Sequence, residues 1–208
     1  MPRPPVDTVV FDIGGVLVDW DPRHLYRGLF AGDDSAMEAF LGQVCTPAWN
    51  HEMDAGRPRA EAVAELVDRY PHLAAPIRAW TERWLEMISG EIAGTVDVLD
   101  RLAGRGVRLL GLTNWSAETF PVARQRFPSL RRFEAVVVSG EHGVAKPDPA
   151  LFRVLLDVLA VDPARAVYVD DRAENVATAT ALGLHGLLFS DPATLHRDLV
   201  RFGLLPPG

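Results

Sequence analysis

The stretch Val9-Val10-Phe11-Asp12-Ile13-Gly14-Gly15-Val16-Leu17-Val18-Asp19 decides how the rest of the chain folds. Thr8 to Phe11 is apolar and β-branched enough to form a buried strand of a parallel sheet, and it ends on Asp12 and two glycines. Open α/β sheets bind ligands at the carboxyl ends of their strands, and Gly14-Gly15 lets the main chain turn tightly beside a ligand. Asp12 is therefore a candidate nucleophile, and the plainer alternative is a strand followed by a turn.

The composition indicates a globular protein with a core of its own. The chain has 208 residues, 48% of them hydrophobic, which suits one or two domains. It contains no apolar run as long as a membrane span or a signal-peptide core, and its single cysteine, Cys45, cannot form an intrachain disulfide. We therefore expect a cytoplasmic protein without a membrane partner. The net charge of -7 argues against a nucleic-acid partner.

The region from residue 20 to residue 90 is predicted to be helical. Asp21-Pro22 begins one helix, and four more are predicted over Ser35 to Leu41, Pro47 to Met53, Arg59 to Arg69 and Pro71 to Ile88. Because strand patterns are missing here, we interpret the region as a helical insertion after the first strand. Trp49, Trp80 and Trp84 are expected in the core of this insertion.

From Gly94 onward, helices and strands alternate, which is typical of a parallel sheet with crossover helices. The predicted helices are Thr95 to Ala103, Ser116 to Phe127, Pro149 to Leu159, Ala173 to Leu182 and Pro192 to Phe202. The predicted strands are Val107 to Leu112, Ala135 to Val138, Ala166 to Val169 and Gly186 to Phe189. With the first strand, the fold class is α/β, with a parallel sheet of about five strands and helices on both faces.

Polar groups that are far apart in the sequence lie at or near the ends of these strands: Asp12, Thr113-Asn114, Lys146 and Asp170-Asp171. Right-handed crossovers bring the carboxyl ends of parallel strands to one edge of the sheet, so these groups should converge. Taken singly, each has a plainer interpretation as a loop, a solvated lysine or a surface acidic pair. Their joint position predicts a functional site.

The residue types indicate a metal site that binds an anion. Three neighbouring carboxylates need a compensating cation, and oxygen ligands suit Mg²⁺. Asp12 and Asp171 are the predicted direct ligands, joined by the carbonyl of Gly14, while Asp170 supports them and Asn175 orients a ligand or water. Positive charge and hydrogen-bond donors for a phosphoryl group would come from Lys146, Thr113 and Asn114.

With these motifs, the sequence resembles the haloacid dehalogenase superfamily of hydrolases. The matching segments are Phe11 to Leu17, Leu112 to Asn114, Lys146 to Asp148 and Val169 to Asn175, in the family's order. The resemblance implies a Rossmann-like core, formed by residues 1–19 and 91–208. It also implies a small all-helical cap of the first type (C1), formed by residues 20–90.

The resemblance further implies a phosphatase that acts on a small phosphorylated molecule. Asp12 would attack phosphorus and form an aspartyl-phosphate, which water then hydrolyses. The implied ligands of Mg²⁺ are Asp12, the Gly14 carbonyl and Asp171, and the implied phosphoryl-binding residues are Thr113, Asn114 and Lys146.

The chain departs from the family at Gly14, where most of its phosphatases carry a second aspartate that protonates the leaving group. A branch with the same departure includes bacterial sugar-1-phosphate phosphatases, whose leaving group depends less on an acid. Asp19, His51 and Asp54 are candidates to replace that acid. One alternative function is a metal-free 2-haloacid dehalogenase, although the resemblance implies that dehalogenases lack an acidic residue at the place of Asp171. Another is a non-catalytic phosphate-binding protein.

Overall fold

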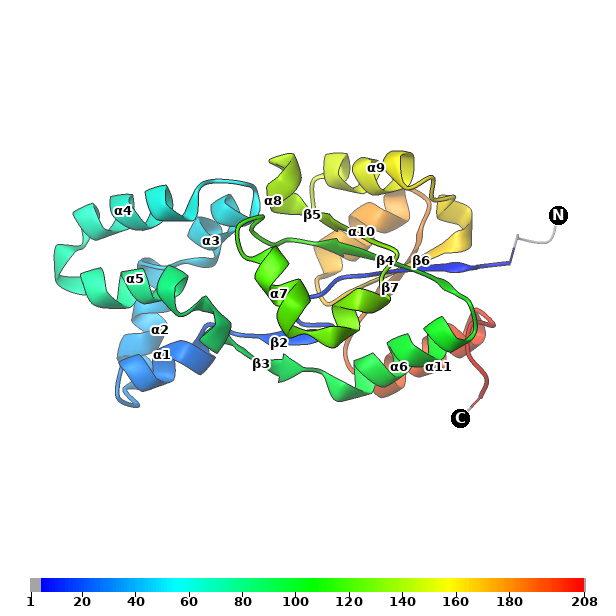
Figure 1. Ribbon diagram of the computed structural model, residues 1–208, viewed down its shortest axis with the longest axis horizontal. Coiled ribbons are helices and arrows are strands. Elements are labelled where there is room, and N and C mark those ends of the chain that lie inside the picture. Colours follow the sequence, from blue (N-terminus) through cyan, green and yellow to red (C-terminus); the bar gives the residue numbers. More distant parts are fainter. Residues whose placement is uncertain (1–4, 208) are drawn as a thin grey trace.

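The computed structural model describes residues 5–207, and its centre is a five-stranded parallel sheet (Figure 1). The sheet has the order β5-β4-β1-β6-β7, and β1 pairs in parallel with β4 and β6 on its two sides. The strands are β1 (Thr8–Phe11), β4 (Arg108–Thr113), β5 (Ala135–Val138), β6 (Ala166–Asp170) and β7 (His185–Leu188). The predicted α/β fold class is confirmed. Asp12 directly follows β1, the central strand of the sheet.

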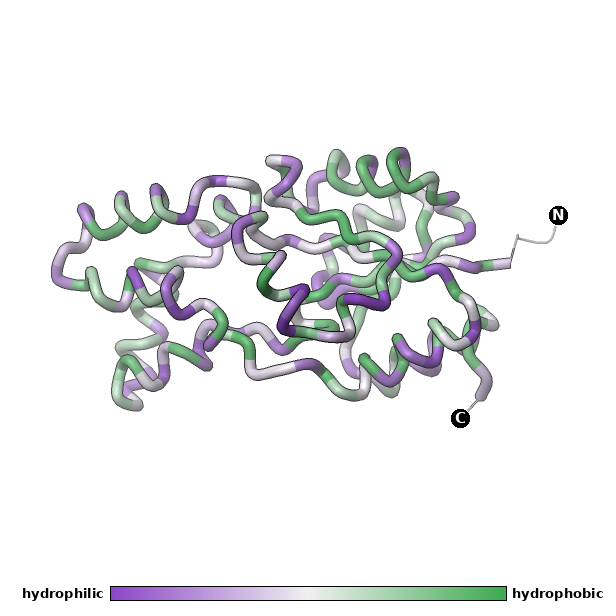
Figure 2. Tube along the Cα trace, viewed as in Figure 1, coloured by the Kyte–Doolittle hydropathy of each residue, from purple (hydrophilic) through white to green (hydrophobic). Residues whose placement is uncertain are grey.

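Helices cover both faces of this sheet because alternate strand residues point to opposite sides. On one face, Val9 and Phe11 share a buried cluster with residues of α6 (Ala93–Gly104) and α11 (Pro192–Arg201). On the other face, Val10 packs with residues of α9 (Pro149–Val158), and α10 (Ala173–Ala181) lies beside them (Figure 1). Figure 2 shows these apolar stretches along the sheet and on the helices around it.

The helices of the insertion form a separate group at one end of the molecule (Figure 1). They are α1 (Arg23–Leu29), α2 (Asp34–Gln43), α3 (Pro47–Asp54), α4 (Arg59–Arg69) and α5 (Ala74–Glu82). Their side chains form a hydrophobic cluster of their own, in which the rings of Trp49 and Trp80 lie 5.4 Å apart. Trp84 was expected in this cluster, but it packs edge-on against Trp115 beside the sheet, with the ring centroids 6.4 Å apart.

Two predictions for the insertion are wrong. The helix predicted over Pro71 to Ile88 is divided into η1 (Pro71–Leu73), α5 and η2 (Trp84–Met87). It is interrupted at Leu73, with φ −109° and ψ 15°, and at Arg83, with φ −125° and ψ 23°. The region was also predicted to contain no strand, yet β2 (Val18–Trp20) and β3 (Ile88–Glu91) form an antiparallel pair. Their mutual hydrogen bonds satisfy two short segments whose side chains are partly exposed.

The segments after β4 and β5 also differ from the prediction. The helix expected from Ser116 begins only at Phe120, as α7 (Phe120–Arg126), and η3 (Pro128–Arg132) follows it. A short helix that was not predicted, α8 (Ser139–His142), follows β5 directly. None of the helices within residues 5–207 is long and apolar enough to cross a membrane.

Candidate active site

Asp12 is fixed at the carboxyl end of β1 by its neighbours. Its N–H donates to the carbonyl of Val169 at 2.8 Å, and its Oδ1 accepts from the N–H of Ile13 at 2.6 Å. Burial raises the pKa of Asp12 to about 7, although the positive charge of Lys146 acts in the opposite direction. Asp12 is therefore a buried carboxylate whose ionised form needs a counter-charge.

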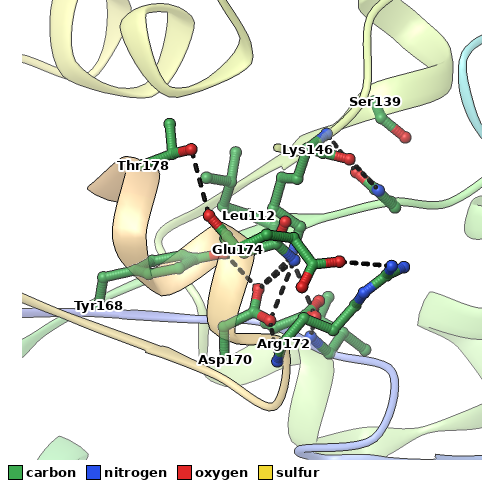
Figure 3. Close-up of polar contacts among 12 residues, drawn as sticks. Leu112, Ser139, Lys146, Tyr168, Asp170, Arg172, Glu174 and Thr178 are labelled. Carbon is green, nitrogen blue, oxygen red and sulfur yellow. Dashed lines mark hydrogen bonds and ion pairs between the residues drawn. The ribbon is translucent and has the colours of Figure 1, made fainter. Parts of the chain in front are cut away.

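Lys146 supplies part of that charge from a position that is 1% exposed. Its Nζ lies 3.0 Å from Asp12 Oδ2 and 2.8 Å from Asp170 Oδ2, and it donates to the carbonyl of Leu112 at 2.9 Å (Figure 3). These three contacts occupy all three donors of the ammonium group. Lys146 is therefore held in one place, between two carboxylates.

Asp170 differs from Asp12 because the protein itself satisfies its oxygens. Besides Lys146, it accepts hydrogen bonds from the hydroxyl of Tyr168, from Asn175 Nδ2 at 3.0 Å and from the N–H of Arg172 at 2.8 Å (Figure 3). Burial acts to raise the pKa of Asp170, but the charge of Lys146 and the hydrogen bonds from Lys146, Tyr168 and the N–H of Arg172 together outweigh it, and this pKa lies below its usual value. Asp170 is thus an ionised support, and the amide of Asn175 points to it.

Asp171 completes a group of three carboxylates. One oxygen from each of Asp12, Asp170 and Asp171 lies within 4.8 Å of the others. Burial, helped by the charge of Asp170, raises the pKa of Asp171. With all three ionised and one lysine among them, the group has a net charge of -3 + 1 = -2. Oxygen ligands with this charge fit one divalent cation of the Mg²⁺ type.

Thr113 is the last residue of β4, the strand beside β1, and Asn114 follows it. Thr113 is buried at the end of that strand. The amide of Asn114 bonds to the main chain of Lys146 on both sides, with Nδ2 donating to its carbonyl at 2.9 Å and Oδ1 accepting from its N–H at 2.8 Å. Asn114 therefore fixes the lysine segment, and its amide already has partners within the protein.

Two further residues of the site were not singled out from the sequence. Tyr168 lies two residues before Asp170 in the same strand, so both side chains point to one face. Ser139 is the first residue after β5, and its hydroxyl accepts from the N–H of Trp115 at 2.9 Å. The signal that identified the other strand-end residues, a polar side chain directly after a strand, also applies to Ser139.

The three candidates for the missing acid lie in different surroundings. Asp19 and His51 are exposed, and Asp19 on β2 pairs with Ser89 and, at 3.2 Å, with His24. Asp54 is half-buried at the end of α3, where its main-chain carbonyl accepts from Ser139. Burial raises the pKa of Asp54 to about 7, against the opposing effects of Arg59 and a hydrogen bond from Asn50. Of the three candidates, Asp54 is therefore the one that contacts the segment following β5.

Several known proteins resemble most of this chain, among them a mouse protein and a fungal one. The acyl-CoA dehydrogenase family member 10 of Mus musculus is 25% identical over 213 residues, which cover 92% of this chain and 18% of that protein. The sesquiterpene phosphatase astK of Aspergillus oryzae is 26% identical over 182 residues, covering 88% of this chain and 89% of that protein. This chain thus spans less than two thirds of the mouse protein and most of the fungal one.

Solved structures share the fold at lower identity. A HAD family enzyme of Bacteroides thetaiotaomicron, in complex with magnesium and inorganic phosphate, has a TM-score of 0.67 at 18% identity and covers 89% of this chain and 95% of that one. An L-2-haloacid dehalogenase of Xanthobacter autotrophicus has a TM-score of 0.63 at 18% identity, with coverages of 97% and 85%. Residues 6–183 match the haloacid dehalogenase-like hydrolase family. This chain is therefore a member of the haloacid dehalogenase-like hydrolases.

Proposed function

We propose that this hydrolase is a Mg²⁺-dependent phosphatase that acts on a small phosphate monoester, such as a sugar phosphate. The observation that carries the proposal is the group of three carboxylates around one buried lysine, with its net charge of -2. Such a group favours a divalent cation, which can in turn bind a phosphoryl group, whereas displacement of a halide needs no metal. The relative astK is named a phosphatase, and the Bacteroides enzyme was solved with magnesium and phosphate, which supports this choice.

In this proposal, Asp12 is the nucleophile. A carboxylate oxygen of Asp12 forms a bond to phosphorus while the bond from phosphorus to the leaving oxygen breaks. Water then attacks the aspartyl-phosphate, releasing inorganic phosphate and restoring the carboxylate. Lys146, Thr113 and Asn114 would contact the phosphoryl group, for which one Lys146 donor would turn from Asp12, while Asp170 with Asn175 keeps Lys146 in position. Mg²⁺, held by Asp12, the carbonyl of Gly14 and Asp171, would neutralise the charge of the phosphoryl oxygens.

The same proposal assigns the two parts of the chain. Residues 1–19 and 91–208 form the core that carries the site, and residues 20–90 form a cap that contacts the leaving group. The separate hydrophobic cluster of the inserted helices supports this division.

The test is phosphate release from p-nitrophenyl phosphate and a panel of sugar phosphates, with Mg²⁺ and with EDTA. We expect release only with Mg²⁺ and its loss in Asp12→Asn, which keeps the shape of the side chain but removes the nucleophile. Asp33→Asn, at the exposed N-cap of α2, is the matched control and should keep the activity. Lack of release by the unchanged protein under every condition would contradict the proposal. Release of halide from 2-haloacids in EDTA would replace it with dehalogenation.

A further inference from the structure

The hydroxyl of Ser139 joins two parts of the molecule that are far apart in the sequence. Ser139 is fully buried, and its Oγ accepts a hydrogen bond from the N–H of Trp115 at 2.9 Å. The same Oγ donates to the main-chain carbonyl of Asp54, the last residue of α3. A second acceptor for its proton, the carbonyl of Trp115, lies 3.4 Å away. The hydroxyl proton therefore has two acceptors, one in the insertion and one beside the sheet.

On the sheet side, Ser139 holds the segment that leads to the candidate active site. Trp115 follows Asn114, whose amide bonds to the main chain of Lys146. The N–H of Gly140 also donates to the carbonyl of Trp115, at 3.1 Å. Figure 3 shows Ser139 at the edge of this polar network. The main chain of Trp115 is therefore fixed on both sides by the two residues that follow β5.

On the other side, Ser139 contacts a segment of the insertion that we name the docking segment, residues 54–59. A second hydrogen bond reaches it from the sheet domain, with the N–H of Arg59 donating to Glu118 Oε1 at 2.9 Å. A Cβ at Gly56 would lie 3.2 Å from the carbonyl of Gly140, so the main chains approach closely there. The docking segment thus contacts the two segments that follow β4 and β5, through Glu118 on one and Ser139 and Gly140 on the other.

We propose that Ser139 is a positioning residue that couples occupation of the phosphoryl site to contact of the docking segment. When its proton is donated to Asp54, its oxygen becomes a better acceptor for the N–H of Trp115, because linked hydrogen bonds polarise one another. When the docking segment moves away, the proton turns to the carbonyl of Trp115 and this support is lost. The inference rests on the proposed function, since the occupant is a phosphoryl group.

The coupling must act in both directions. If docking strengthens anion binding, anion binding strengthens docking by the same factor. An anion at the site should therefore slow amide hydrogen exchange in the docking segment, with the N–H of Arg59 as its reporter. Removing the hydroxyl of Ser139 should weaken anion binding and abolish this protection together.

The experiment uses orthovanadate with Mg²⁺ as the probe, and compares its dissociation constant with hydrogen exchange over residues 54–59. In the unchanged protein, vanadate should slow exchange there. In Ser139→Ala, we expect about tenfold weaker vanadate binding and no protection at saturation, since one hydroxyl's bonds are lost. Ser139→Thr keeps a hydroxyl and should restore both properties. As long as Ser139→Ala stays almost fully folded at the working temperature, a loss of stability alone does not change its apparent dissociation constant.

Two further variants sharpen the result. Ser129→Ala is the matched control, because Ser129 is a buried serine whose hydroxyl has no partner among residues 5–207. It should leave both readouts unchanged. Glu118→Ala removes the other docking contact without removing the Ser139 bond, and through the coupling it should weaken vanadate binding about two- to threefold.

The inference is overturned if vanadate protects residues 54–59 equally in Ser139→Ala, or if Ser129→Ala causes the same losses. Should Ser139→Ala not fold, Glu118→Ala decides, and unchanged vanadate affinity in that variant overturns the coupling. Failure of the unchanged protein to bind vanadate in Mg²⁺ is a separate result, because it contradicts the proposed phosphatase itself.

Discussion

The carboxylate of Asp171 occupies the space that a side chain at Gly15 would need. A Cβ built at Gly15 would lie 2.5 Å from Asp171 Oδ2, and Gly15 has a φ of +74°. Glycine is required there both for the left-handed turn and for the approach of the carboxylate. The segment that carries Asp171 can thus approach the turn after Asp12 because position 15 has no side chain.

Gly15→Ala should therefore impair the site more than the fold. The methyl group displaces Asp171, and a shift of about 1 Å at a reacting centre costs about 100-fold in rate. We expect such a loss in phosphatase activity, together with a higher Mg²⁺ concentration for half-maximal rate. The measurement is the initial rate of phosphate release over a Mg²⁺ titration.

The control for this variant is Gly32→Ala. Gly32 has a similar φ of +84°, but no atom lies within 4 Å of the added Cβ. It should lose about 1 kcal/mol of stability and keep the activity. Equal loss of activity in both variants would show that backbone strain, rather than Asp171, explains the effect.

Lys146 should be important for stability as well as for activity. Lys146→Met leaves Asp12 and Asp170 buried without their shared counter-charge, so the free energy of unfolding should fall by about 3–5 kcal/mol. Adding Asp170→Asn should recover part of this loss. Arg132→Met breaks an exposed pair with Asp100 and should cost less than about 1 kcal/mol. Urea unfolding distinguishes these cases, and similar losses in both lysine and arginine variants would contradict the prediction.

The half-buried carboxyl of Asp54 should make stability depend on pH. Its pKa is raised from 3.8 to about 7 by burial, so the folded state binds more protons than the unfolded state between these values. Stability from this group is therefore present below about pH 4 and is lost as the pH rises toward 7. Asp54→Asn removes this dependence, and relative to the unchanged protein it should gain about 2–4 kcal/mol between pH 4 and pH 8. The prediction is contradicted if the difference in the free energy of unfolding between Asp54→Asn and the unchanged protein is the same at pH 4 and at pH 8.

The centre of the sheet was predictable from the sequence because β1, β4 and β6 are buried runs between clear helix signals. The strand Ala135–Val138 was predicted at its observed bounds. By contrast, Val18–Trp20 has only three residues, and Ile88–Glu91 continues the helical spacing of Ile77, Trp80 and Trp84, so neither shows a strand period. Pairing between segments 70 residues apart supplies what these local patterns lack.

For the site, residue types were predictable but contacts between them were not. The positions of Asp12, Asp170 and Asp171 at strand ends were read directly from the motifs. Asn114, however, bonds to the main chain of a residue 32 positions away, and no spacing rule specifies this contact. Such contacts depend on how two loops meet above the sheet, which is a tertiary property.

Gly14 offers the most direct test of how the leaving group is protonated. A Cβ at Gly14 would meet no atom within 4 Å, and its φ lies outside the left-handed region. Gly14→Asp should therefore fit, and it places a carboxyl group two residues after the proposed nucleophile. Relative to the unchanged protein, we expect Gly14→Asp to raise kcat/KM at least about tenfold for alkyl phosphates, whose poor leaving groups need a proton. For p-nitrophenyl phosphate we expect little change. Gly14→Asn, which has the same shape but no acidic proton, is the control. If both variants show the same dependence on leaving-group pKa as the unchanged protein, then an acid elsewhere already protonates the leaving group, and Asp54 becomes the residue to replace next.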